Sequence, residues 1–194
     1  EPYFSTKDEK TDKEAVIELS ERLDIDGIVA YSSDPSAPTA AYVSEKLGLP
    51  GNPYASVEIL ARKDLFRAFI EEHGFNTPRS KSFYDIDEAR IWLEEIGTPA
   101  FIKPVDSSGS KGVTGLENAN SFDEAFEHAL QFSREKKVVV EEAIIRKGYQ
   151  VAGDGFVVYG KLVFRCWSDE HFDKLCNGTV FFHPINYSAK YNKI

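Results

Sequence analysis

A short apolar run, a lysine near its end and a loop of serines and glycines follow one another in Pro99-Ala-Phe-Ile-Lys-Pro-Val-Asp-Ser-Ser-Gly-Ser-Lys-Gly-Val113. Glycine and serine let the backbone turn sharply and expose successive N–H groups, an arrangement that binds phosphate oxygens. Lys103 and Lys111 add positive charge at either end of the loop. The loop does not match a Walker A motif, because no Gly-Lys-Ser/Thr sequence opens a helix here. It joins two runs with strand character, so we interpret it as a flap over phosphates.

A polar hairpin connection is the alternative interpretation of this loop, since Ser-Ser-Gly-Ser alone is a common sequence. The context favours phosphate binding. A lysine inside an apolar strand, directly before a flexible glycine loop, needs a buried partner or one that a ligand supplies. An anionic ligand would supply that partner.

The composition is that of a soluble globular protein, since 42% of the 194 residues are hydrophobic and 28% are charged. No apolar run approaches the length of a membrane span and the N-terminus has no signal-peptide pattern, so we expect no membrane partner. The net charge of −9 argues against a nucleic-acid partner, which would require a basic face. It leaves a nucleotide ligand open, because a few local lysines can bind one phosphate chain.

Two further features concern the setting of the chain. Cys166 and Cys176 have no metal-type spacing. We expect them to be free thiols in a reducing cytoplasm, with a disulfide left open. The chain starts at Glu1 and contains no methionine. We therefore expect it to be a fragment of a longer protein.

The first 54 residues have the element order of a parallel α/β layer. Apolar spacing predicts helices over residues 13–23 and 37–47, and an apolar run predicts a buried strand over 28–31. Helix, strand, loop and helix in this order are typical of α/β domains. The glycines and prolines of 48–53 predict a boundary. Residues 1–54 are therefore interpreted as the remnant of a parallel α/β domain.

The rest of the chain, residues 55–194, is expected to be α+β. Between residues 98 and 141 the order is strand, loop, strand, helix and strand, which predicts an antiparallel sheet with a helix on one face. Ser121 and Glu124 have the spacing of a capping box for that helix. Asp169-Glu170-His171 is expected in a loop. The other expected elements are helices over 56–61, over 65–72, capped by Asp64, and over 85–95, and strands over 80–84, 149–159 and 161–167.

A second constellation lies where the apolar run 138–140 meets Glu141 and Glu142 and continues into a second apolar segment, 143–145. An adenine ring needs apolar faces, an acceptor for its exocyclic amine and a backbone N–H for a ring nitrogen. A carboxylate beside an extended apolar backbone provides all three. The alternative is a solvated strand end, which would be preferred without the glycine loop upstream.

Three elements in order carry a specific resemblance. They are Arg62-Lys63-Asp64 at the head of a helix, Ile102-Lys103-Pro104 before the glycine loop, and Glu141-Glu142 with Gln150 eight residues after the second glutamate. The combination resembles the ATP-grasp superfamily, which includes biotin carboxylase, carbamoyl phosphate synthetase, phosphoribosylamine–glycine ligase and D-alanine–D-alanine ligase.

The resemblance covers residues 55–194 and implies an ATP-grasp fold of the α+β class, with nucleotide between two subdomains. Residues 98–141 would form a lid-type subdomain and 142–194 the start of the second subdomain. The C-terminal part of the domain would be missing from the chain. Residues 1–54 would be the tail of the α/β domain that precedes the ATP-grasp module.

The resemblance also implies roles for the phosphate-binding residues. Lys63 matches the lysine that contacts the α-phosphate. Lys103 matches the strand lysine that bridges the phosphates and the adenine edge. The flexible loop that closes on the β- and γ-phosphates would consist of Ser107, Ser108, Gly109, Ser110, Lys111 and Gly112.

For the base and sugar, the resemblance implies that Glu142 accepts from the adenine amine, with the backbone of Ala143 and Ile145 completing adenine recognition. Glu141 is the rival for this role, because the family usually has one acid at the strand end. Gln150 falls where many members have a glutamate that binds the ribose hydroxyls. An amide can make similar hydrogen bonds.

One departure from the family concerns the metal. The family binds magnesium through a glutamate and a Glu-x-Asn pair on late strands, and no Glu-x-Asn follows residue 160. We therefore expect ATP and Mg²⁺ as cofactors, with no metal ligand within the chain. The magnesium ligands and the transition-state arginine would lie beyond its C-terminus.

The implied activity of the full-length protein is that of an ATP-dependent carboxylate–amine ligase. ATP would phosphorylate a small carboxylate substrate, and an amine would attack the acyl phosphate. The chain alone is expected to bind nucleotide weakly and to be inactive. The alternative is a non-catalytic nucleotide-binding or regulatory module. A cytoplasmic location is expected, and a homodimer is left open.

Overall fold

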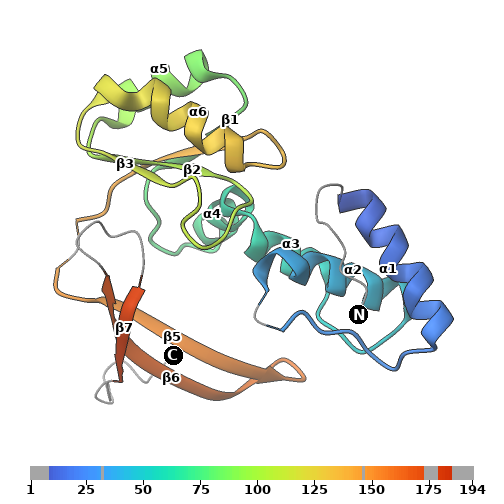
Figure 1. Ribbon diagram of the computed structural model, residues 1–194. Coiled ribbons are helices and arrows are strands. Elements are labelled where there is room, and N and C mark those ends of the chain that lie inside the picture. Colours follow the sequence, from blue (N-terminus) through green and yellow to red (C-terminus); the bar gives the residue numbers. More distant parts are fainter. Residues whose placement is uncertain (1–8, 32, 146, 173–178, 185–194) are drawn as a thin grey trace. The chain divides into compact units, whose positions relative to one another are not determined.

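Figure 1 shows the computed structural model, which describes residues 9–31, 33–145, 147–172 and 179–184. The chain divides into two compact units, Glu1–Ala143 and Ile144–Ile194. The first unit combines helices with a sheet and the second is built on a sheet, so the predicted α+β class is confirmed. The boundary at residue 54 and the subdomains 98–141 and 142–194 stay predictions.

Helices make up the beginning of the first unit. They are α1 (Glu9–Leu23), the short 3₁₀ turn η1 (Asp34–Ser36), α2 (Ala37–Leu47) and α3 (Tyr54–Ala61). Lys13 Nζ donates to the hydroxyl of Tyr54 at 3.0 Å and so connects α1 to α3. The ring of Tyr42 in α2 stands edge-on to that of Tyr54. α2 ends at Gly48, whose φ of 66° is the left-handed conformation that glycine adopts without strain.

The buried strand predicted over residues 28–31 is wrong. No strand forms there, and Val29 and Tyr31 are 81% and 88% exposed. A strand needs a neighbour to satisfy its backbone hydrogen bonds, and in the described part of the chain the first strand begins only at Ser80. The apolar run therefore remains irregular, and the described residues of this region show helices without the expected parallel layer.

The sheet of the first unit carries the charged side chains of Lys103 and Glu141. Its strands are β1 (Ser80–Phe83), β2 (Ala100–Pro104), β3 (Thr114–Leu116) and β4 (Val138–Glu142). Their order is β1-β4-β2-β3, and each neighbouring pair is antiparallel. The predicted succession of strand, loop, strand, helix and strand over residues 98–141 is thus confirmed.

The core of the first unit lies between one face of this sheet and two helices, α5 (Ile86–Ile96) and α6 (Phe122–Phe132), which run over the sheet in Figure 1. Each large apolar side chain removed from water contributes about 1.5–3 kcal/mol. The fully or nearly fully buried members include Phe83, Leu93, Ile102, Phe122, Phe126, Val138 and Val140.

Strand alternation separates this core from a charged face. Successive side chains of a strand point to opposite faces. Ile102 and Val140 are directly paired and belong to the core. Their neighbours Lys103 and Glu141 therefore point away from the core, to the other face of the sheet.

Helix starts were predicted correctly for α5 and incorrectly for α6. Asp85 accepts hydrogen bonds from the N–H groups of Asp87 and Glu88 at 2.9 and 3.0 Å, as an N-cap does. The capping box of Ser121 and Glu124 is wrong, because Ser121 makes no side-chain cap. Residues Ala119–Ser121 form a 3₁₀ turn (η2) that runs straight into α6, so Ser121 lacks the extended backbone of an N-cap.

The second unit contains an antiparallel sheet in the order β5-β6-β7, with β5 (Gln150–Val158), β6 (Lys161–Phe172) and β7 (Thr179–Pro184). The two strands predicted over 149–159 and 161–167 form a hairpin, in which Tyr159 and Gly160 have positive φ, of 48° and 74°. The loop predicted for 169–171 is wrong. Asp169 and Glu170 pair with both β5 and β7, and His171 pairs with β7, so these residues continue β6.

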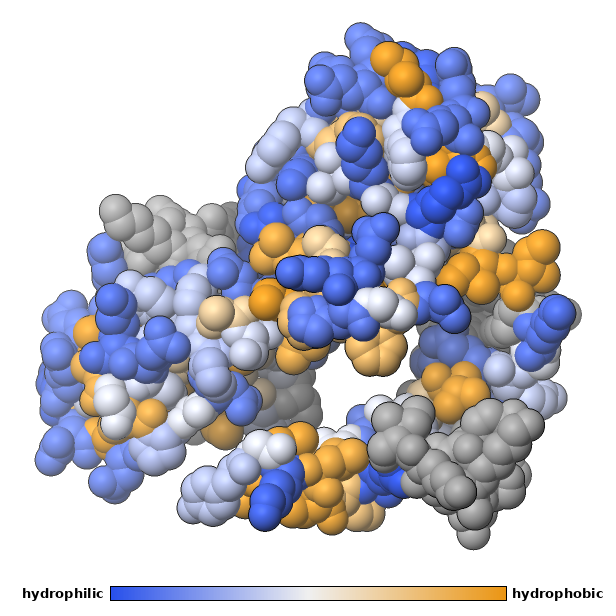
Figure 2. Space-filling view, turned by 180° about the vertical axis from the view of Figure 1, so that it is seen from behind, coloured by the Kyte–Doolittle hydropathy of each residue, from blue (hydrophilic) through white to orange (hydrophobic). Residues whose placement is uncertain are grey.

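The β5–β6 hairpin carries many exposed apolar side chains, among them Phe156, Leu162, Val163 and Phe164. Figure 2 shows hydrophobic residues, in orange, at the surface of this unit. Cys166 of β6 is an exposed free thiol, while Cys176 lies outside the described residues. None of the helices in the described ranges is long and apolar enough to cross a membrane.

Candidate functional site

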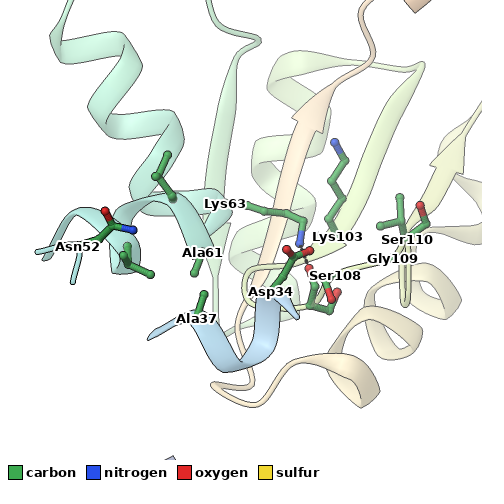
Figure 3. A pocket seen from close by; sticks show the side chains of 13 residues that line it. Asp34, Ala37, Asn52, Ala61, Lys63, Lys103, Ser108, Gly109 and Ser110 are labelled. Carbon is green, nitrogen blue, oxygen red and sulfur yellow. Dashed lines mark hydrogen bonds between the residues drawn. The ribbon is translucent and has the colours of Figure 1, made fainter. Parts of the chain in front are cut away.

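A pocket of about 630 Å³ in the first unit brings together part of the predicted phosphate-binding set (Figure 3). Lys63 comes from α4 (Lys63–Glu72), and Lys103 comes from β2. Both line the pocket with the first part of the glycine loop and with residues of the N-terminal helical region. The lining residues from the loop are Ser107, Ser108, Gly109 and Ser110, and those from the N-terminal region include Asp34, Asn52, Val57 and Leu60.

Lys63 is fixed by two hydrogen bonds that lead toward the loop. Its backbone N–H donates to the carbonyl of Val105 at 2.9 Å, and its Nζ donates to the carbonyl of Ser107 at 2.6 Å. Burial, followed by the nearby charge of Lys103, lowers the pKa of the Lys63 ammonium. Two cations at one partly buried place repel each other, so an anionic ligand between them would be stabilised.

Ion pairs of Asp64 connect the start of α4 to Lys137, the residue before β4. Asp64 was predicted as the N-cap, but the helix begins one residue earlier and Asp64 lies in its first turn. Its carboxylate accepts from Arg62 and from Lys137, both at 3.0 Å. Burial disfavours this charge, but the hydrogen bonds from Arg62 and Lys137 outweigh it and lower the pKa of Asp64. The ion pairs hold the segment that presents Lys63.

The glycine loop bends tightly back on itself. Ser107 Oγ donates to the carbonyl of Lys111 at 2.7 Å. Gly109, Ser110 and Gly112 all have positive φ, of 63°, 57° and 74°. A Cβ at Gly112 would lie 2.9 Å from the Cβ of Phe132, so glycine is required there for space as well as conformation. Of the predicted loop residues, Lys111 and Gly112 lie next to the pocket-lining part.

Glu141 is joined to Lys103 on the charged face of the sheet. The Glu141 side chain is only 5% exposed and accepts from Lys103 Nζ through Oε1. Arg67, from the middle of α4, donates to the same carboxylate, with Nε 3.0 Å from Oε2. Burial opposes ionisation, but the hydrogen bond from Arg67 and the charge of Lys103 prevail and lower the pKa of the Glu141 carboxyl.

Glu142 lies on the opposite face of β4 and has other partners. Its carboxylate accepts from the side chain and the backbone N–H of Arg79, at 2.9 and 3.0 Å. These two hydrogen bonds lower the pKa of the Glu142 carboxyl. Ala143 follows, and its N–H donates to the carbonyl of Pro99 at 3.0 Å. Ile145 is largely exposed. The strand therefore brings Glu141, not Glu142, beside Lys103.

Gln150 belongs to the second unit, at the start of β5. Its side-chain N–H donates to Glu170 Oε2 at 2.8 Å. Within the ranges that the structure describes, no group of three or more His, Cys, Asp or Glu side chains is placed to hold a metal ion.

Arg67 and the N-terminal wall of the pocket were missed in the sequence. Arg67 stands four residues after Lys63, which puts the two on the same side of α4. That spacing was the available signal. Asp34, Asn52, Val57 and Leu60 had none, because their role depends on how the helices before α4 pack.

Sequence comparisons place this architecture among known families. The family described as "D-ala D-ala ligase C-terminus" matches residues 68–156. A D-alanine–D-alanine ligase from Oceanobacillus iheyensis is 32% identical over 94 residues, which are 46% of this chain and 25% of the relative. A phosphoribosylamine–glycine ligase from Methanopyrus kandleri is 29% identical over 150 residues, which are 73% of this chain and 33% of the relative.

Solved structures agree with the sequence matches. An L-amino acid ligase from Bacillus licheniformis superposes with a TM-score of 0.70 at 21% identity, covering 95% of this chain and 43% of its own. The biotin carboxylase domain dimer of the Hydrogenobacter thermophilus 2-oxoglutarate carboxylase, in complex with MgADP, ADP and bicarbonate, gives 0.66 at 19% identity. It covers 87% of this chain and 39% of its own.

These matches define the class of the protein as one with an ATP-grasp fold. The chain is similar to ATP-grasp proteins in both sequence and fold, as the resemblance of its motifs implied. It spans between a quarter and a third of the length of the two curated relatives described above.

Proposed function

We propose that this chain is the ATP-binding portion of an ATP-dependent carboxylate–amine ligase. The observation that carries the proposal is the convergence of Lys63, Lys103 and the glycine loop on one pocket. Relatives named as D-alanine–D-alanine ligase and phosphoribosylamine–glycine ligase support the reaction class. A structural neighbour in complex with MgADP supports the ligand.

The phosphate chain would occupy the pocket between the two lysines. Lys63 and Lys103 supply charge from separate elements, and the N–H groups of the loop residues Ser107 to Ser110 supply donors. A bound phosphate would relieve the repulsion between the two ammonium groups. It would also compete with the Ser107 carbonyl for Lys63 Nζ and with Glu141 for Lys103 Nζ.

The base would be read by Glu141. Glu141 shares a sheet face with Lys103, and Glu142 points to the other face and is held by Arg79. An ionised carboxylate can accept from the exocyclic amine of adenine. In this arrangement Lys103 leaves Glu141 for the phosphates, and the Glu141 oxygen that it contacted becomes an acceptor for the base. The N–H of Ala143 already donates to the carbonyl of Pro99. Ala143 can therefore offer the base its own carbonyl oxygen.

In the chemistry of the whole protein, the γ-phosphoryl group passes to a carboxylate oxygen of the substrate and ADP leaves. An amine then attacks the acyl carbon of the acyl phosphate, forming the C–N bond and releasing phosphate. Lysines that neutralise phosphoryl charge and a loop that excludes water are the contributions of this chain. Mg²⁺ would neutralise further charge on the phosphates, but the described residues offer it no ligand cluster, and no step here depends on its position.

Calorimetric titration of the chain with ATP and ADP tests the binding half of the proposal. We expect weak binding that is lost in a double variant, Lys63→Met with Lys103→Met, while Lys81→Met serves as a matched control outside the pocket. No heat of binding with either nucleotide would overturn the proposal. ATP hydrolysis by the purified 194-residue chain would contradict the expectation that this portion is inactive alone.

A further inference from the structure

Arg67 holds both carboxylate oxygens of Glu141. Its Nε donates to Oε2 at 3.0 Å, and its Nη2 lies 3.4 Å from Oε1. Lys103 contacts the same carboxylate only through Oε1. A guanidinium is planar and carries its donors in a rigid fork, so two contacts fix the orientation of a carboxylate as well as its position. An ammonium group on a flexible stem fixes much less.

The two cations also differ in the cavities that they line. Lys103 lines the proposed phosphate pocket. Arg67 lines a different pocket, of about 350 Å³, beside α4 and β1. Phosphates in the first pocket would draw Lys103 toward them and leave Arg67 where it is. The contact between Arg67 and Glu141 is therefore the one that survives nucleotide binding.

Glu141 needs that contact because it is buried. A buried carboxylate without a partner is costly and takes up a proton. A protonated carboxyl group carries a donor as well as an acceptor, and can pair with the carbonyl of guanine as well as with the amine of adenine. The ionised state of Glu141 is thus what would distinguish the two bases.

We propose that Arg67 is the positioning residue for base recognition, which keeps the Glu141 carboxylate ionised and in a fixed orientation while Lys103 turns to the phosphates. The inference rests on the proposed function, in which Glu141 reads the base. Arg67 lies four residues after Lys63 on α4, and the backbone N–H of Lys63 is anchored to Val105. Helix α4 therefore supports both Lys63, which would contact the phosphates, and Glu141, which would recognise the base.

The test is to measure the affinities of the 194-residue chain for ATP and GTP by calorimetry in wild type, Arg67→Ala and Arg67→Lys. Wild type should prefer ATP at least about tenfold. Arg67→Ala should lower ATP affinity about tenfold and leave GTP affinity nearly unchanged, so that the preference disappears. Arg67→Lys should retain part of the preference for ATP over GTP. Arg79→Ala removes an arginine–glutamate pair on the opposite face of the sheet and should keep the wild-type ratio.

A double-mutant cycle separates this role from a structural one. In a Glu141→Gln background, Arg67→Gln should change the ATP:GTP ratio no further, because Arg67 acts through Glu141. A folded Arg67→Ala or Arg67→Gln variant with the wild-type ratio of ATP to GTP affinity would overturn the inference. An equal loss of affinity for both nucleotides would overturn it too. Should Arg67→Ala fail to fold, Arg67→Gln decides the question. Absence of nucleotide binding in wild type would overturn the proposed function itself.

Discussion

Lys63 Nζ donates a 2.6 Å hydrogen bond to the carbonyl oxygen of Ser107, so the first residue of α4 also holds the first residue of the pocket-lining loop. The same ammonium group lies near Lys103, which disfavours its charge. A phosphate that enters the pocket can replace the carbonyl as the partner of Lys63. Phosphate binding would then break the contact between Lys63 and Ser107 and release the loop.

Lys63→Met should loosen the loop and weaken nucleotide binding. The variant keeps the apolar stem but loses the donor and the charge, so amide hydrogen exchange over residues 107–112 should become faster. ATP affinity should fall about tenfold or more, as expected for a lost charge-assisted hydrogen bond. Lys111→Met removes one charge from the loop itself and is the control. Unchanged exchange in Lys63→Met would show that the Ser107 contact does not hold the loop.

Lys103→Ala should weaken ATP binding more than Lys111→Ala. Lys103 is held in β2 and is largely buried between Glu141 and the pocket, whereas Lys111 is exposed on the loop, where salt screens its charge. We expect a loss of about tenfold or more for Lys103→Ala and a clearly smaller one for Lys111→Ala. Titrations at low and high salt check the ranking. Equal losses would mean that the loop clamps the phosphates as tightly as the strand does.

The pairing of Glu141 should make the stability of the protein depend on pH in the acid range. The pKa of Glu141 is lowered in the folded protein from its ordinary value of 4.5, so the folded state binds fewer protons than the unfolded state there. The stability that Glu141 contributes is complete above pH 4.5 and is lost as the pH falls through the lower, folded pKa. Glu141→Gln should cost about 1–3 kcal/mol at pH 7, and its deficit should shrink on acidification.

Thermal unfolding of wild type and Glu141→Gln at pH 7 and at several values below pH 4.5 measures this difference. Glu142→Gln is the matched control, because its carboxylate is more exposed and faces Arg79 on the other side of the strand. It should cost less stability at pH 7. A deficit for Glu141→Gln that is the same at all pH values would show that the lost contact is not ionic.

The sequence was informative where a local pattern determines the structure. The spacing around the glycine loop predicted two antiparallel strands, and the helix expected over 85–95 agrees with α5. The apolar run 28–31 was misread because strand formation depends on a partner elsewhere in the chain. The acidic residues 169–171 were misread for the converse reason, since two neighbouring strands are available to them.

The lysines of the candidate site could be found in the sequence, but the glutamate that pairs with Lys103 could not. A lysine before a glycine loop can be found in the sequence, but which of two adjacent glutamates faces it depends on strand register. A shift of one residue reverses the face. The register of β2 against β4 pairs Ile102 with Val140, and this places Glu141 on the side of Lys103. Arg67 could be recognised only once α4 was packed beside that strand.

The adenine preference should therefore depend on Glu141. A carboxylate there accepts from the amine of adenine and would face the carbonyl oxygen of guanine, acceptor against acceptor. An unpaired buried acceptor costs about 1–3 kcal/mol, so ATP should be preferred over GTP at least about tenfold. Glu141→Gln adds a donor and should narrow the gap, whereas Glu142→Gln should leave it as in wild type. Competition titrations of ATP against GTP in the three proteins measure the gap. If only Glu142→Gln reduces the preference for ATP over GTP, the base is recognised on the other face of β4. If wild type binds ATP and GTP equally well, the base is not recognised by this strand.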